Sequence, residues 1–331
     1  KTDEMFLGLP NILDKDAPIG KDDKENKEIR KYGEIRLKNF EVKSHIDLGI
    51  SRDLIDVDDA SRVAGSRFFY LKGKLAQLEV ALELYSLNKL ASKGLKIILP
   101  PLMLKREVYE GLVHVTTFAD ALYKVTGLED TGEEERYLIS TTEHPLIAMF
   151  ANKTIPIEET PIKLAGLSAA FRKEAGSHGK DTKGIFRVHQ FYQTEQIAIC
   201  KPEESASIQQ EFLRNTEEMW QELGIPYHVV DVCSGDMGIR DYRQFDIEAY
   251  MYAQKTYREV GSFDNCTDWI SRRSNIKLVD KNGNKYYAHT VDSTGIAIER
   301  AIVAIMENYQ ESDGTIKIPN VLVKYCGFSE I

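Results

Sequence analysis

The stretch FRKEAGSHGKDTKGIFRVHQFYQTEQ, residues 171–196, shows strand-like alternation at both ends and a polar, glycine-containing middle. This pattern predicts a hairpin whose two strands are joined by a long loop. Arg172 and Arg187 would lie at the two feet of that loop and hold planar guanidinium groups over the sheet, an arrangement suited to phosphate. On periodicity alone, a solvated surface hairpin is the more common explanation.

Composition limits the classes of protein that this chain can represent. Its 331 residues can form one large domain or two smaller ones, and the net charge of −9 disfavours nonspecific nucleic-acid binding by the surface as a whole. The four cysteines are far apart in the sequence and have no histidine at ligand spacing, which argues against a zinc site. No run of about 18 apolar residues is present, so we expect no signal peptide, no membrane span and a cytoplasmic location.

The order of helical and strand-like segments predicts the fold class. Residues 1–36 are charged and are expected to form an extended, largely solvated lead-in to a single domain, residues 37–331. Strand patterns are found at 96–104, 137–141, 227–233, 245–251, 256–263, 275–279 and 285–291, and helical patterns at 67–93, 143–150, 203–223 and 295–309. Because neighbouring strands are joined by short turns, we expect an α+β fold with a mostly antiparallel sheet flanked by helices. No GxGxxG or GxxxxGKS motif is present, which argues against a Rossmann or P-loop nucleotide site.

Three further segments carry side chains of possible chemical use. Glu195 lies within an apolar strand pattern, where a carboxylate is seldom buried without a ligand or partner. TTEHP places Thr141, Thr142 and Glu143 directly after a strand, and REVGSF places Glu259 near Ser262. Hydroxyl and carboxylate oxygens of this kind can hold Mg²⁺ together with phosphate. Taken singly, each of these features is more often structural than functional.

Four segments, read in order, carry a resemblance to a known family. They closely resemble the catalytic domain of seryl-tRNA synthetases, which are class II aminoacyl-tRNA synthetases. The segments are TTEHPL, the 171–196 stretch, TYREVGSFDNCTDWISRRSNI and HTVDSTGIAIERAIVAIMENYQ. The resemblance covers nearly the whole chain, and TTEHPL is more archaeal-like than bacterial. It implies that serine and ATP react to give seryl-adenylate and pyrophosphate, and that the seryl group then passes to the 3′ end of tRNA(Ser).

The resemblance also assigns roles to individual residues. Arg172 and Arg300 are expected to be the catalytic residues, Arg172 on the α-phosphate and Arg300 on the γ-phosphate. Glu174 is expected to receive the adenine amino group, and Phe191 to stack on the adenine. The full set expected to bind ATP is Arg172, Lys173, Glu174, Arg187, Val188, Phe191, Glu259, Val260, Gly261, Ser262 and Arg300. Glu259 and Ser262 are expected to hold Mg²⁺.

Serine binding and dimerisation follow from the same resemblance. The residues expected to bind serine are Thr141, Thr142, Glu143, Arg172, Glu195 and Thr294, with Glu143 near the ammonium group and Glu195 near the hydroxyl. The predicted helix 67–93 and the strand that ends at Pro100 resemble motif 1 of the family, which forms a homodimer interface. The apolar stripe of this helix, Leu71 to Tyr85, is compatible with core packing or with a dimer seam.

Departures from the family pattern leave alternatives open. The N-terminal coiled-coil arm that grasps tRNA would precede Lys1, so the chain is either part of a longer protein or a natural armless relative. Asp292 replaces the usual asparagine, and Glu299 places an unusual charge beside Arg300; Gly261 is a mild variation on a small residue. An amino-acid-activating relative with a non-tRNA acceptor and a noncatalytic relative are the competing hypotheses. The second predicts lost catalytic residues, yet Arg172 and Arg300 are present.

Overall fold

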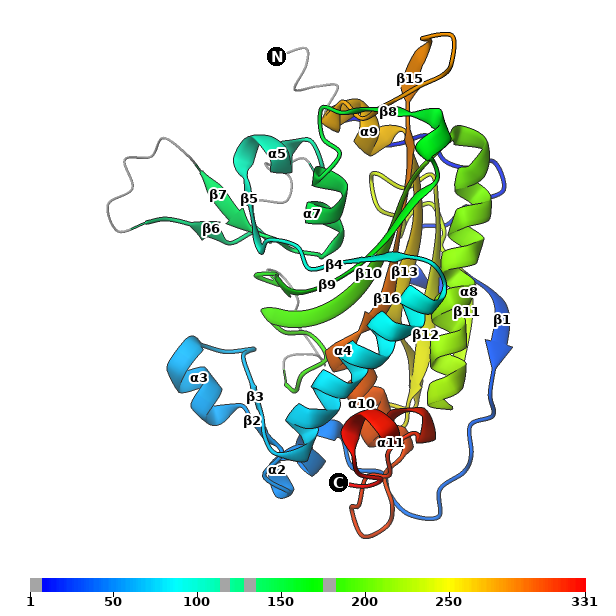
Figure 1. Ribbon diagram of the computed structural model, residues 1–331. Coiled ribbons are helices and arrows are strands. Elements are labelled where there is room, and N and C mark those ends of the chain that lie inside the picture. The colour runs from blue at the N-terminus through cyan, green and yellow to red at the C-terminus, as the bar shows by residue number, and fades with distance from the viewer. Residues whose placement is uncertain (1–7, 114–119, 128–134, 175–182) are drawn as a thin grey trace.

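A large, mostly antiparallel sheet forms the centre of the computed structural model, which describes residues 8–113, 120–127, 135–174 and 183–331 (Figure 1). Its eight strands in the described residues follow the order β1-β11-β12-β13-β16-β10-β9-β4. Their bounds are β1 Lys27–Tyr32, β11 Tyr227–Asp231, β12 Arg243–Met251, β13 Thr256–Thr267, β16 His289–Ala297, β10 Gln190–Cys200, β9 Ile162–Phe171 and β4 Lys96–Ile98. Only the β4–β9 pair within this sheet is parallel. The predicted α+β class is therefore confirmed.

Strands β9 and β10 form the hairpin predicted from residues 171–196. Phe171 pairs with Gln190, and the backbone N–H of Arg172 donates to the carbonyl of His189 at 3.0 Å. Both predicted arginines therefore lie at the feet of the loop, while its middle, residues 175–182, lies outside the described residues. Because side chains alternate along a strand, Glu195 shares a face with Ile197, and Ala198 faces the opposite side.

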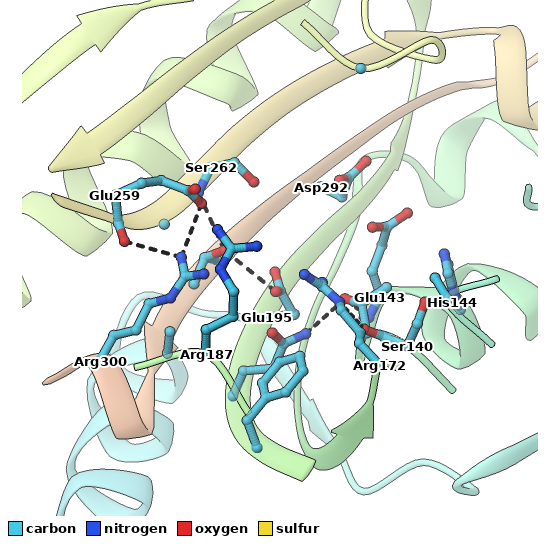
Figure 2. A pocket seen from close by; sticks show the side chains of 18 of the residues that line it. Ser140, Glu143, His144, Arg172, Arg187, Glu195, Glu259, Ser262, Asp292 and Arg300 are labelled. Carbon is cyan, nitrogen blue, oxygen red and sulfur yellow. Dashed lines mark hydrogen bonds and ion pairs between the residues drawn. The ribbon is translucent and has the colours of Figure 1, made fainter. Parts of the chain in front are cut away.

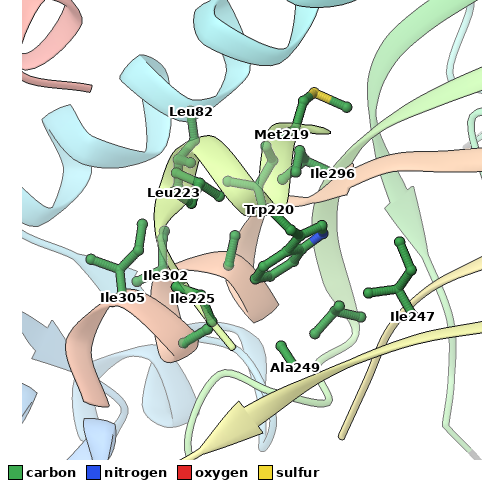
Figure 3. Close-up of a cluster of buried hydrophobic side chains, with 14 of the residues drawn as sticks. Leu82, Met219, Trp220, Leu223, Ile225, Ile247, Ala249, Ile296, Ile302 and Ile305 are labelled. Carbon is green, nitrogen blue, oxygen red and sulfur yellow. The ribbon is translucent and has the colours of Figure 1, made fainter. Parts of the chain in front are cut away.

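One face of the sheet is covered by three long helices (Figure 1). These are α4 Lys74–Ser92, α8 Ser205–Leu223 and α10 Ile298–Asn308, and α11 Asn320–Cys326 packs on α4. Figure 3 shows Trp220 of α8 within the apolar cluster that these helices form with the sheet. The stripe that includes Leu75, Leu78 and Leu82 lies inside this core at 0% exposure. Of the two explanations left open for this stripe, core packing is the one observed.

Two predicted helices begin later than their patterns suggested. The helix predicted from residue 67 begins at Lys74, because Tyr70–Leu71 form strand β3 against β2, Ile55–Asp56. Gly73 separates the two elements with a φ of +57°, a conformation that suits glycine. The helix predicted from residue 295 begins at Ile298, because strand β16 continues to Ala297.

Smaller elements pack on the other face of the sheet. Helices α5 Arg106–Glu110, α7 Glu143–Ala148 and α9 Trp269–Ser274 bury a second apolar cluster there. Two three-stranded sheets accompany them, β5 Met103–Lys105 with β7 Arg136–Leu138 and β6 Lys124–Val125, and β15 Lys285–Tyr287 with β14 Lys277–Val279 and β8 Thr154–Pro156. Helices α2 His45–Ser51 and α3 Asp58–Ala64 complete the described helices, with short 3-10 turns η1 Asp23–Glu25, η2 Ile157–Glu159 and η4 Pro202–Glu204. None of the described helices has the length and apolar character needed to cross a bilayer.

The charged N-terminal segment is attached to this body. Strand β1 is exposed at every residue, as expected of a solvated segment, but it pairs with β11 at the edge of the main sheet. Further upstream, the Asn11 side-chain amide donates to the carbonyls of Arg240 at 2.8 Å and Cys266 at 2.9 Å. The described part of residues 1–36 thus supports the loop that carries Arg240.

Candidate active site

A cavity of about 360 Å³ opens on the face of the sheet opposite the long helices. Strands β10, β13 and β16 form its floor, and the hairpin feet, the start of α7 and the loop 232–242 form its walls. The predicted residues that line it are Thr141, Glu143, Arg172, Glu174, Arg187, Val188, Phe191, Glu195, Glu259, Val260, Gly261, Ser262, Thr294 and Arg300. Residues from segments more than a hundred positions apart are thereby brought together.

Two predicted site residues do not line the cavity. Thr142 is fully buried, and its hydroxyl hydrogen-bonds the Ser168 hydroxyl at 2.7 Å, behind the cavity wall. Lys173 is exposed, with its Nζ 5.7 Å from the centre of the Tyr123 ring. Their proposed contacts with substrate therefore have no support from the geometry.

Arg172 is held at one side of the cavity by main chain and by an aromatic ring. Its Nε donates to the Ser140 carbonyl at 2.9 Å, and its guanidinium carbon lies 5.1 Å from the centre of the Phe191 ring. Burial, together with the nearby charge of Arg300, lowers the pKa of Arg172. Burial and a like charge both disfavour the cation, so an anion bound between the two arginines would relieve the repulsion.

Arg187 and Arg300 lie close to each other and are paired with carboxylates (Figure 2). Arg187 Nη1 is 3.1 Å from Glu174 Oε2, and Arg300 Nη1 is 3.2 Å from Glu259 Oε1. The Phe186 ring packs 5.0 Å from the Arg300 guanidinium carbon. These contacts orient the two guanidinium groups toward the cavity, where a phosphate could replace the carboxylates as their partner.

Glu259 and Ser262 fit a site for a hard cation that also binds phosphate. Partial desolvation at the cavity wall favours a higher pKa for Glu259, but Arg300 and Arg172 lower the pKa overall, so this carboxyl is ionised at neutral pH. Its side chain is 47% exposed, and Ser262 lines the same cavity. Two protein oxygens match the few ligands that Mg²⁺ takes from proteins when phosphates and water complete its shell. Among the described residues, no group of three or more His, Cys, Asp or Glu side chains could hold a metal by itself.

The other end of the cavity is polar and buried. Thr141 Oγ1 accepts a hydrogen bond from Gln193 Nε2 at 2.7 Å, and Thr294 Oγ1 donates to Glu195 Oε1 at 3.4 Å. Glu195 is only 6% exposed. Burial, and then the charges of Glu143 and nearby aspartates, raise the pKa of Glu195 well above its usual value. Burial and like charge both disfavour the ionised form of Glu195, so a hydrogen-bonding or cationic ligand would be favourable there.

Arg240 is a cavity residue that the sequence did not reveal. Its guanidinium pairs with Glu143, with Asp292 at 2.8 Å and with Asp264 at 3.1 Å. Although burial opposes ionisation, Arg240 and neighbouring groups lower the pKa of Glu143 overall, whereas burial keeps the pKa of Asp292 well above its usual value. Asp292 therefore faces Arg240 and Glu143.

The two other departures from the family pattern also find explanations. Glu299 is 3% exposed, and its two carboxylate oxygens accept the backbone N–H of Tyr192 at 2.9 and 3.0 Å. Glu299 thus connects α10 to β10, and its carboxylate points toward the strand. At Gly261, an added Cβ would lie 3.1 Å from Thr294 Cβ, so glycine lets Thr294 approach the strand closely.

Comparison with known families places the chain among the aminoacyl-tRNA synthetases. Residues 123–309 match the class II tRNA synthetase core domain of the glycine, histidine, proline, serine and threonine enzymes. The serine–tRNA ligase of Methanocella arvoryzae is 43% identical over 327 residues, which cover 98% of this chain and 76% of that protein. The serine–tRNA ligase of Pyrococcus horikoshii is 44% identical over 352 residues, covering 100% and 76%.

Solved structures give the same result. The seryl-tRNA synthetase of Pyrococcus horikoshii, complexed with ATP, superposes with a TM-score of 0.95 at 43% identity, covering 99% of this chain and 77% of that one. The cytoplasmic serine–tRNA ligase of Naegleria fowleri, in complex with AMP, superposes with a TM-score of 0.93 at 34% identity, covering 99% and 78%.

Proposed function

Since this chain belongs to the serine–tRNA ligase family of class II aminoacyl-tRNA synthetases, we propose that its cavity is the place where serine reacts with ATP. The family activity is the ATP-dependent attachment of serine to tRNA. One observation carries the assignment of the site: Arg172, Arg300 and the buried Glu195 line a single cavity. Phosphate ligands and a polar amino-acid pocket are thus adjacent.

The first step forms a bond between a serine carboxylate oxygen and the α-phosphorus of ATP. It breaks the bond between that phosphorus and the oxygen that bridges it to the β-phosphorus. The carboxylate is already ionised at neutral pH, so this step requires no general base. Pyrophosphate leaves with the electrons of the broken bond. The protein must therefore align the two substrates and neutralise charge on the phosphorus oxygens.

Arg172 is placed to serve both substrates. It lies in the cavity together with the buried group that includes Glu143 and Glu195 and the more open group that includes Arg300. We assign it to the α-phosphate and to the serine carboxylate. Phe191, whose ring lies against Arg172, is assigned to the adenine face, and Glu174 to the adenine amino group.

Arg187 and Arg300 are assigned to the terminal phosphates. The Arg300–Glu259 pair is partly exposed, at 20% and 47%, and such pairs contribute only about 0–1 kcal/mol, so phosphate oxygens can replace Glu259. Glu259 and Ser262 are assigned to Mg²⁺, which when bound neutralises charge on the phosphates. A free carboxylate at Glu259 becomes available when Arg300 turns to phosphate.

The buried end is assigned to serine itself. Glu143 and Thr141 would receive the ammonium group, and Glu195 and Thr294 the hydroxyl. A pocket built to hydrogen-bond a hydroxyl rejects alanine, because its buried polar groups would be left unpaired. The Glu195–Thr294 contact supports this assignment.

We assign the second copy of a homodimer to the outer face of α4 and the adjoining strand. Apolar side chains are exposed there, including Val80 at 61%, Leu84 at 48% and Leu99 at 74%. The inward face of α4 is already filled by its own core, so these residues are the part of motif 1 left for a partner. A cytoplasmic location is also proposed, since the Naegleria relative is described as cytoplasmic.

Serine-dependent ATP–pyrophosphate exchange tests the proposal. Exchange is expected with serine, weakly with alanine, and only in the presence of Mg²⁺. Charging of tRNA(Ser) transcripts is then measured with the same protein. Absence of serine-dependent exchange would refute the assigned site chemistry, whereas exchange without charging would point to a different acyl acceptor.

A further inference from the structure

Arg240 connects the carboxylates at the amino-acid end of the cavity. It lies in the loop between β11 and β12, and its partners come from three other elements: Glu143 begins α7, Asp264 lies on β13 and Asp292 on β16. The side chains of these three acids are 4–6% exposed, and that of Arg240 is 19% exposed. The neighbouring Asp241, 4% exposed, lies 3.4 Å from Arg240 Nε, so a single guanidinium serves four buried acids, three of them from other parts of the chain.

Removal of this guanidinium would leave the acids without a positive charge. Asp264 and Asp292 are direct cross-strand partners, and like charges in this arrangement repel each other. Burial makes such a group costly unless it is paired. Arg240 also lines the cavity, so its effect is exerted at the substrate and not only within the core.

We propose that Arg240 is a positioning residue for the amino-acid substrate: it fixes the Glu143 carboxylate at the point where the substrate ammonium group is received. This inference rests on the proposed function, because it takes serine as the ligand of that end. It assigns to Arg240 an effect on serine affinity and none on ATP affinity. The reason is that the two sets of contacts are separate: Arg240 pairs with Glu143, Asp241, Asp264 and Asp292, whereas Arg187 and Arg300 pair with Glu174 and Glu259.

The same geometry explains the aspartate at position 292. Arg240 supplies one positive charge, so Glu143 and Asp292 cannot both keep an unshared negative charge in a buried site. Asp292 lies 2.8 Å from Arg240 Nη2 and Glu143 pairs with Nη1 of the same group, so the two acids share one guanidinium.

The test compares two conservative arginine substitutions. Arg240→Lys keeps the charge but loses the fork that joins several acids. Arg243→Lys is the matched control: Arg243 forms a comparable pair with Asp231, at 2.9 Å from Nε and 2.5 Å from Nη2, and does not line the cavity. Kinetic constants for serine and for ATP are measured by pyrophosphate exchange, and folding is checked by thermal melting.

Arg240→Lys is expected to raise KM for serine about tenfold or more, because Glu143 would no longer be held where it receives the serine ammonium group. KM for ATP is expected to change less than about twofold. Arg243→Lys should leave both constants within about twofold. If Arg240→Lys does not melt cooperatively, Arg240→Gln replaces it with the same expectation.

Several results would overturn the inference. These are an unchanged KM for serine in the Arg240 variant, a parallel rise of both KM values, and a loss of kcat alone. Failure of both Arg240 variants to fold would also overturn it, because Arg240 would then be required for the fold. A parent protein without serine-dependent exchange would instead refute the proposed function, so the two failures are distinguishable.

Discussion

The two ends of the cavity hold their charges in different ways. At the nucleotide end, Arg300 pairs with Glu259, whose side chain is 47% exposed, and Arg187, itself 36% exposed, pairs with Glu174. At the amino-acid end, Arg240 joins several acids that are nearly inaccessible, including Glu143 at 5%. The Arg300–Glu259 pair can be exchanged for phosphate oxygens at little cost, whereas the buried cluster around Arg240 is costly to break.

This difference indicates how the site divides its work. A flexible triphosphate is met by arginines that can change partners as it binds. A small amino acid offers few contacts, so its pocket has to be fixed before binding, and the polar groups there are already hydrogen-bonded. Substitutions at the two ends should therefore differ in which kinetic constant they change.

The largest effect is expected at the residue shared by both ends. Arg172→Ala should lower kcat for pyrophosphate exchange by about 10²–10³ or more, because it removes a group that stabilises charge on the reacting phosphate. Melting temperature should change little, because Arg172 forms a main-chain hydrogen bond at the cavity wall and no ion pair with any residue that the structure describes. An exchange rate close to that of the parent would contradict the role given to Arg172.

The next effect sharpens the comparison at the amino-acid end. Glu195→Ala should reduce the preference for serine over alanine by about tenfold to a hundredfold, since the serine hydroxyl would lose its buried partner. The preference is the ratio of kcat/KM values in exchange. Gln193 neighbours this site and bonds Thr141, so Gln193→Ala is a suitable comparison, expected to change binding without changing the serine-to-alanine ratio. A ratio unaffected by Glu195→Ala would exclude the hydroxyl contact.

A smaller effect is expected at the nucleotide end. Arg187→Ala should raise KM for ATP by about threefold to tenfold and leave KM for serine unchanged, because Arg187 is assigned to the terminal phosphates and not to serine. The effect is modest because Arg187 is partly exposed and already paired with Glu174. The rise should be greatest at low ionic strength, where charge interactions are least screened. A change in KM for serine of similar size would show that the two ends are not separable.

The smallest effect lies outside the cavity, on α4. Burial, followed by the neighbouring Glu83, raises the pKa of Glu79 to about 7. The folded chain therefore holds the Glu79 proton more tightly than the unfolded chain. The stability that this proton contributes is complete below the ordinary glutamate pKa and is lost as the pH rises through about 7. Glu79→Gln should therefore gain on the order of 1 kcal/mol relative to the parent between pH 5 and 8.

Denaturant unfolding at a fixed protein concentration measures this change in the free energy of unfolding. Glu107→Gln, at an exposed position of α5, is the control and should show no such gain. Equal pH dependence in Glu79→Gln and in the parent would mean that Glu79 is ionised normally.

Much of the fold could be predicted from local sequence patterns, whereas the roles at the nucleotide end were predicted from the resemblance to seryl-tRNA synthetases. The hairpin was found because alternation and glycine content are local properties, and Glu195 because a carboxylate is conspicuous within an apolar strand. The sequence pattern does not locate the start of α4, because helical spacing continues upstream of Gly73, where Tyr70–Leu71 in fact form a strand.

Arg240 could not be found by the same means. Apart from the adjacent Asp241, its acidic partners are 97, 52 and 24 positions away, and the loop that carries it has no periodicity. The available signal was indirect: Asp264 and Asp292 lie in strands and required a positive charge from somewhere. Only the tertiary fold shows which arginine supplies it.

The central claim is that one cavity holds the phosphate ligands and the serine pocket together. A crystal structure with a non-hydrolysable sulfamoyl analogue of seryl-adenylate tests it most directly. We expect the linking group beside Arg172, the adenine against Phe191, and the seryl group between Glu143 and Glu195. An analogue bound with its seryl group away from Glu195, or outside this cavity, would contradict the account.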